Sequence, residues 1–122
     1  METLFEIEPI NIPPKQKKVR LTKDEKLVKL VADFSNPIIA REVEGKCFMV
    51  CSVLQPYLEW CGIYCRLIQG EVTTDKAWYG HYWIELFDGR IIDPTASQLE
   101  GLNLPQTYLG ELPKEYLKLI IL

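Results

Sequence analysis

One stretch constrains the fold of this chain more than any other: residues 80–95, GHYWIELFDGRIIDPT. Apolar and aromatic residues crowd its first half, as they do in β-strands. The Asp-Gly pair in its middle is a strong turn signal. Pro94 ends the second half, because proline cannot donate a hydrogen bond to a β-ladder. We therefore predict a β-hairpin whose strands cover Trp78–Leu86 and Arg90–Asp93.

The length of the hairpin loop decides which face of the hairpin carries Asp93. A two-residue turn pairs Asp93 with Ile84 and puts it on the face opposite His81, because side chains alternate along a strand. A three-residue loop with Gly89 in the left-handed conformation pairs Asp93 with Trp83 and puts it on the face of His81. The sequence allows both registers. Only the second can bring the one histidine of the chain and Asp93 into a common site.

Cys47 opens an apolar segment with helical periodicity, directly after Gly45-Lys46. Unpaired amides and the helix macrodipole favour negative charge at a helix N-terminus. A thiol at that position ionises more easily, and the thiolate is the attacking species. With His81 as base and Asp93 as the group that orients its ring, Cys47 would complete a nucleophilic triad. Cys47, His81 and Asp93 are therefore the predicted catalytic residues.

The N-terminal part of the chain is predicted to contain an extended arm followed by one helix. Residues 1–21 are punctuated by prolines and are expected to lie across the body of the protein. Thr22 and Glu25 have the spacing of a capping box, which begins a helix at about residue 23. We expect this helix to end near residue 34, because the residue before Pro37 avoids the helical conformation.

The second helix is expected to begin at Cys47 and to end at Gly62, a natural helix terminus. Pro56 lies inside this pattern and should kink the helix or restart it, because proline removes one backbone hydrogen bond and clashes with the preceding turn. Residues 63–72 have the apolar run of a buried strand. Residues 116–122 are compatible with a last strand or a docked helical turn, and we favour the strand.

Length and charge narrow the class of protein. The 122 residues are expected to form a single domain, 1–122, with a sizeable core. The net charge of −3 argues against nucleic acid as the main partner. The sequence has no apolar run long enough to span a bilayer and no recognisable signal peptide. We therefore predict a cytoplasmic protein without a membrane partner.

The four cysteines raise the alternative of a metal site. Cys47 and Cys51 lie one helical turn apart, and Cys61 and Cys65 have the same spacing across Gly62. Structural zinc sites usually have shorter spacing between their cysteines. In the cytosol, disulfides are also uncommon. We predict no metal and no cofactor, with Cys51, Cys61 and Cys65 as thiols of the core.

Three segments together resemble small phage and bacterial proteins of the papain-like and transglutaminase-like cysteine enzyme superfamily: GKCFMVCSVL at 45–54, GHYW at 80–83 and DGRIIDPTASQ at 88–98. In that superfamily the triad residues follow in the order Cys, His, Asp. The resemblance covers about residues 45–98, the predicted Cys-His-Asp core. It implies an α+β fold in which N-terminal helices, including the Cys47 helix, pack on a small antiparallel sheet that carries His81 and Asp93.

The resemblance also implies an activity. We expect a small cysteine hydrolase or acyl-transferase, similar to peptidases, amidases and deamidases, that acts on a protein or peptide-like amide through a covalent acyl-enzyme. The superfamily includes members that have lost activity. The alternative is therefore an inactive, papain-like binding module, encoded by a phage and acting on a host protein in the host cytoplasm.

Further residues are candidates for the surroundings of the triad. Trp83 and Glu85 share the predicted face of His81, and with Gln98 they are the predicted cleft residues. In the two-residue register, Glu85 would replace Asp93 as the group that orients His81. Papain-type enzymes have a glutamine before the cysteine as an oxyanion donor. This chain has none there, and only Asn36 and Arg41 offer side-chain donors in that part of the sequence.

Overall fold

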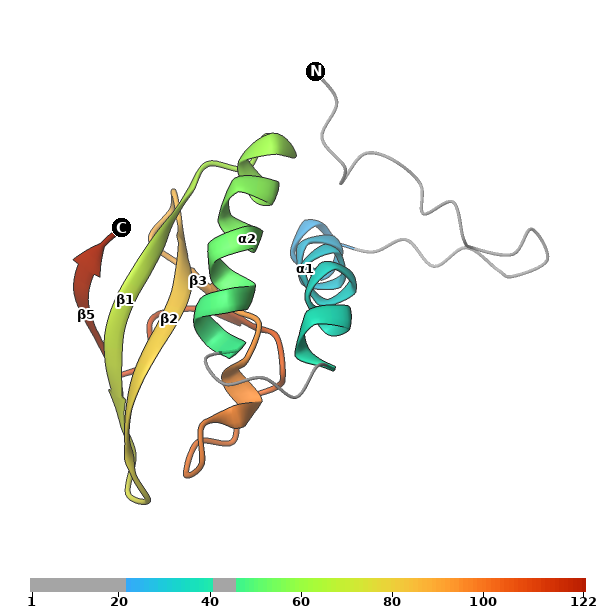
Figure 1. Ribbon diagram of the computed structural model, residues 1–122. Coiled ribbons are helices and arrows are strands. Elements are labelled where there is room, and N and C mark those ends of the chain that lie inside the picture. Colours follow the sequence, from blue (N-terminus) through green and yellow to red (C-terminus); the bar gives the residue numbers. More distant parts are fainter. Residues whose placement is uncertain (1–21, 41–45) are drawn as a thin grey trace.

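The computed structural model describes residues 22–40 and 46–122, so the predicted arm at 1–21 lies outside the described residues (Figure 1). The described elements are two α-helices, five strands and one 3-10 turn, in the order α1 (Lys23–Ile39), α2 (Lys46–Trp60), β1 (Cys65–Thr73), β2 (Trp78–Leu86), β3 (Ile91–Asp93), η1 (Ala96–Gln98), β4 (Tyr108–Gly110) and β5 (Tyr116–Ile121).

The strands form one open antiparallel sheet in the order β4-β3-β2-β1-β5. Both helices lie on the same side of this sheet, with α2 against the strands and α1 beyond it (Figure 1). α2 packs over β1 and β2, whereas α1 contacts α2 and β4. The prediction of an α+β fold, with N-terminal helices on a small antiparallel sheet, is confirmed. Neither described helix is long and apolar enough to cross a membrane.

The first helix begins as predicted but ends later than predicted. The capping box is present, because the Thr22 hydroxyl accepts a bond from the Glu25 amide (3.1 Å) and the Glu25 carboxylate accepts one from the Thr22 amide (3.2 Å). The expected end near residue 34 is wrong, since α1 continues through Pro37 to Ile39. Proline removes only one hydrogen bond there. The helical bonding continues beyond it, since the Ala40 amide bonds the Asn36 carbonyl at 2.9 Å.

The second helix runs through Pro56 without a restart and ends at Trp60. Its buried residues, Val50, Cys51, Leu54 and Leu58, face the sheet and α1. Gly62 follows with φ of +88°, the left-handed conformation that ends many helices, and the Ile63 amide bonds back to the Leu58 carbonyl at 2.9 Å. The predicted terminus at Gly62 is therefore confirmed.

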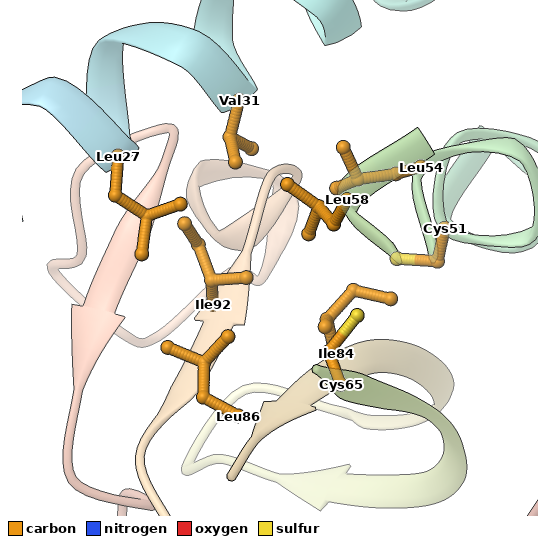
Figure 2. Close-up of a cluster of buried hydrophobic side chains, with 9 residues drawn as sticks. All are labelled: Leu27, Val31, Cys51, Leu54, Leu58, Cys65, Ile84, Leu86 and Ile92. Atoms are coloured by element: carbon orange, nitrogen blue, oxygen red, sulfur yellow. The ribbon is translucent and has the colours of Figure 1, made fainter. Parts of the chain in front are cut away.

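Two clusters of buried apolar side chains cover the two faces of the sheet. The first lies between the helices and the strands (Figure 2). It consists of Leu27, Val31, Cys51, Leu54, Leu58, Cys65, Ile84, Leu86 and Ile92. The second lies on the opposite face, where the connection from β3 to β4 contributes Leu99. It consists of Ile68, Val72, Trp83, Ile91, Leu99 and Tyr116. Alternation along β2 sends Ile84 to the first cluster and Trp83 to the second.

The hairpin adopts the three-residue loop. Gly89 has φ of +88°, and the Leu86 amide bonds to the Arg90 carbonyl at 2.8 Å. Ile84 consequently pairs with Ile92. This register puts Asp93 beside Trp83 and on the face of His81, as one of the two predicted alternatives requires. The last segment forms β5, which confirms the favoured strand.

Candidate active site

The candidate site lies where β3 stops pairing with β2. The β2–β3 ladder includes Ile84 and Ile92, and it cannot continue past Asp93 because Pro94 has no amide hydrogen. In an antiparallel strand the N–H and C=O of one residue point the same way. The backbone N–H and C=O of Tyr82 therefore point toward the part of the β2 edge that β3 no longer pairs with.

The start of α2 covers this edge. The Cys51 thiol donates to the Tyr82 carbonyl at 3.6 Å, and the Phe48 ring lies edge-on to the Tyr82 ring with centroids 4.8 Å apart. The Tyr82 amide lies near the sulfur of Cys47 and lowers the pKa of that thiol. The backbone of Tyr82 thus holds the first turns of α2 against the sheet. This contact brings Cys47 next to His81 on β2.

His81 connects Cys47 to Asp93. The imidazole is only 3% exposed, whereas Cys47 is partly exposed to solvent. The His81 Nε2 atom lies 2.7 Å from Oδ2 of Asp93, and the Cys47 thiol is near enough to the ring to raise the pKa of His81. Because Nε2 is engaged by the carboxylate, Nδ1 is the ring nitrogen available to the sulfur. The structure brings all three predicted triad residues together.

Asp93 is completely buried, and its carboxylate is fully hydrogen-bonded. Oδ1 accepts from the amide and the hydroxyl of Thr95 at 3.0 and 3.3 Å. Oδ2 accepts from the Tyr116 hydroxyl at 2.7 Å and faces His81 at 2.7 Å. An ionised carboxylate has about four lone-pair sites, and four partners surround this one. These bonds offset the cost of burying the charge.

The electrostatics favour a thiolate and an imidazolium. Burial raises the pKa of Cys47, but the hydrogen bond and charge of His81, with the amides of Tyr82 and Phe48, outweigh it and lower the thiol pKa below its ordinary value. Burial lowers the pKa of His81, but Asp93 and Cys47 outweigh it and raise the pKa to about 9. The proton therefore favours the ring over the sulfur at neutral pH.

The other three thiols differ from Cys47. Burial raises the pKa of Cys51, Cys61 and Cys65, that of Cys65 to about 12. None of the four cysteines forms a disulfide. Within residues 22–40 and 46–122, no group of three or more His, Cys, Asp or Glu side chains is placed to hold a metal ion. Cys47 is the one thiol of the chain whose surroundings stabilise its charged form.

Tyr116 and Thr95 are site residues that the sequence analysis missed. Thr95 follows Asp93 by two residues, and an aspartate that bonds the amide two residues on is a common turn pattern, so this contact had a local signal. Tyr116 had none. It begins β5, which is separated from β3 by two strands in the sheet. Its contact with Asp93 depends on the strand order, which the sequence does not reveal.

The predicted cleft residues have other surroundings. Trp83 is fully buried, and its ring packs against Tyr116 with centroids 5.1 Å apart, so it cannot line an open cleft. It shares the face of His81, but the second apolar cluster covers that face. Glu85 binds Arg66 at 2.9 Å and Lys118 at 2.8 Å. The observed register gives Asp93, not Glu85, to His81.

Gln98 and Asn36, which is one of the two sequence-based donor candidates, also have definite positions. Gln98 is exposed on η1. The carboxamide oxygen of Asn36 accepts a bond from the Gln106 side chain at 2.7 Å. Arg41 lies outside the described residues. In place of these side chains, the amides of Phe48 and Tyr82 are the donors found at the Cys47 sulfur.

Comparison with protein-family models, with curated proteins and with solved structures found no match for this chain. Only the geometry and charges of the site itself point to a function, because a fold class alone does not determine one.

Proposed function

We propose that this protein is a small cysteine hydrolase or acyl-transferase with a papain-like or transglutaminase-like fold, acting on an amide or thioester bond of a protein or peptide. The observation that carries the proposal is the series of contacts from the Cys47 thiol through His81 to the buried Asp93. A nucleophile, a base and a group that orients the base, in contact in this order, are the arrangement that acyl transfer requires.

In the proposed reaction, the Cys47 thiolate attacks the substrate carbonyl carbon and forms a C–S bond. The imidazolium of His81 donates its proton to the leaving amine or thiol as the bond to that group breaks, leaving a thioester on Cys47. Neutral His81 then takes a proton from water or from an acceptor amine, which attacks the thioester. The sulfur leaves as thiolate, and His81 again holds the proton. Asp93 keeps the ring oriented throughout.

We assign the amides of Phe48 and Tyr82 to the developing oxyanion. Both amides lower the pKa of the Cys47 thiol, so both lie near the sulfur and near the carbon that it attacks. Backbone amides held by a helix and a strand need little reorganisation during the reaction, which is the basis of oxyanion stabilisation. Two backbone donors would replace the glutamine that papain-type enzymes use.

The experiment that tests this proposal is acylation by a panel of short peptide thioesters, read by intact-protein and peptide mass spectrometry. The parent protein should gain one acyl group on Cys47. Cys47→Ala should gain none, while Cys61→Ala, which removes a buried thiol away from the triad, should react as the parent does. Equal acylation of the parent and of Cys47→Ala would contradict the proposal.

One observation favours the alternative of an inactive binding module. Met49, Val53 and Trp60 share an exposed side of α2, and Trp60 is 70% exposed. Exposed apolar side chains on a helix adjoining the site are typical of protein-binding surfaces. A parent protein that no thioester acylates, and whose Cys47 reacts with iodoacetamide no faster than an ordinary thiol, would support this alternative.

A further inference from the structure

Tyr116 links the last strand of the sheet to the triad. It is the first residue of β5 and pairs with Val72 of β1. Its side chain is 4% exposed, and its hydroxyl donates to Oδ2 of Asp93 at 2.7 Å. Its ring lies edge-on to the His81 ring, with centroids 5.9 Å apart. Tyr116 therefore touches both the base and the carboxylate that orients it.

The hydroxyl of Tyr116 and the ring of His81 share one oxygen atom. Oδ2 of Asp93 receives both at 2.7 Å, while Thr95 holds Oδ1. A donor on Oδ2 withdraws negative charge from the oxygen that stabilises the imidazolium. We propose that Tyr116 is a positioning residue that acts through Asp93, holding its carboxylate and limiting the charge that it offers to His81. The proposal rests on the proposed function, in which His81 must both hold and release a proton.

The groups that face His81 are few. Cys47 comes from α2, Asp93 from β3 and Tyr116 from β5. Trp83, on the same strand, is neutral. Glu85 is the next charged residue on this face of β2, and its carboxylate is paired with Arg66 at 2.9 Å and with Lys118 at 2.8 Å. The charge state of His81 therefore depends on Cys47, Asp93 and the hydroxyl of Tyr116.

Loss of the Tyr116 hydroxyl should make His81 hold its proton more strongly. Burial, and next the charge of Asp93, raise the pKa of Tyr116, so it remains a protonated donor at neutral pH. Without it, Thr95 still fixes Oδ1, and the carboxylate keeps its place beside His81. Oδ2 then carries more charge, and the imidazolium holds its proton more strongly. His81 becomes a weaker acid for the leaving group and is less often the neutral base that the second half-reaction needs.

The test is a nuclear magnetic resonance titration of His81 in ¹⁵N-histidine-labelled protein, where the one histidine of the chain gives an unambiguous signal. Tyr116→Phe keeps the ring and should raise the pKa of His81 by about half a unit or more, because a hydrogen bond to a charged group is lost. Tyr108→Phe is the matched control. It removes a hydroxyl that binds the Glu111 carbonyl and should leave the titration unchanged.

Two further variants make the result specific. In an Asp93→Asn background, Tyr116→Phe should cause no additional shift, because its effect passes through the carboxylate. If Tyr116→Phe does not fold, 3-fluorotyrosine at position 116 is a stronger donor and should lower the pKa of His81. An unchanged His81 titration in the folded Tyr116→Phe protein or with 3-fluorotyrosine, or a shift that persists without Asp93, would overturn the proposal. The titration needs no substrate, so its failure is distinct from a failure of thioester acylation.

Discussion

The two ends of α2 each carry a cysteine, and the two thiols have opposite electrostatic surroundings. Cys47, at the start of the helix, has His81 and two amides beside its sulfur, and its pKa is lowered although burial opposes this. Cys61 directly follows the helix, its amide bonds the Tyr57 carbonyl, and burial raises its pKa. Burial acts in the same direction on both. The partners at the sulfur, not burial alone, decide which of the two thiols has the lowered pKa.

The largest effect is expected from removing His81, because Cys47 should then resemble Cys61. His81→Ala takes away the hydrogen bond and the charge that lower the pKa of Cys47, so the thiol should return toward ordinary behaviour. We expect acylation by a reactive peptide thioester at pH 7 to fall by about 10²- to 10⁴-fold, the range typical of a lost general acid–base group. The measurement is the acylation rate by mass spectrometry. A rate within threefold of the parent would show that His81 does not activate Cys47.

Removing the buried carboxylate should destabilise the fold. Asp93→Ala leaves His81, the Tyr116 hydroxyl and the Thr95 amide without their acceptor. We expect the free energy of unfolding to fall by about 3 kcal/mol in urea denaturation. The control is Asp88→Ala on the same hairpin, whose carboxylate binds Arg90 near the surface. It should cost about 1 kcal/mol or less. Equal losses would mean that the Asp93 network does not stabilise the protein.

The interaction of His81 with Asp93 should also make the free energy of unfolding depend on pH. In Cys47→Ala, Asp93 still raises the pKa of His81 above its unfolded value of about 6.5. Above about pH 6.5, the folded state then binds more protons than the unfolded state. The stabilisation by protonated His81 is therefore fully present below about pH 6.5. The free energy of unfolding should fall as pH rises above about 6.5, by at most about 1.4 kcal/mol per unit, and the fall should end at a lower pH than in the parent because Cys47 no longer helps to raise the pKa of His81. Urea midpoints that change identically with pH in Cys47→Ala and in Cys47→Ala/His81→Asn would contradict this.

The smallest effect is expected at the other end of the helix. Cys61→Ala removes a buried thiol that touches no triad residue, so the alkylation rate of Cys47 at pH 7 should stay within twofold of the parent. Peptide mass spectrometry after iodoacetamide treatment measures it. A larger change would show that the reactivity of Cys47 depends on the packing of the whole helix rather than on its first turn.

Local rules predicted the elements of this fold well and their ends less well. Both predicted helices and the hairpin are present, because each had strong capping, periodic or turn residues. The residues of the loop reduced the register to two alternatives, of which Gly89 adopts the left-handed one. Pro37 failed as a helix end and Pro56 did not restart α2, because tertiary packing outweighs one missing hydrogen bond.

Only the site residues that have a recognisable local sequence pattern could be predicted. Cys47, His81 and Asp93 stand in recognisable local contexts, and the structure brings them together. Trp83 shares the face of His81, but the sequence did not indicate that the β3–β4 connection and Tyr116 cover that face. Tyr116 reaches Asp93 through the order of the strands, a long-range property that no local pattern contains.

The most direct test of the thiolate–imidazolium pair compares Cys47 and Cys61 within one parent molecule. Iodoacetamide alkylation across pH 5 to 10, with peptide mass spectrometry, gives a titration curve for each thiol. Cys47 should react with an apparent pKa well below the ordinary thiol value of about 8.5, and Cys61 should react only above that value. Two curves that coincide near the ordinary value would contradict the central claim that His81 holds the proton of Cys47.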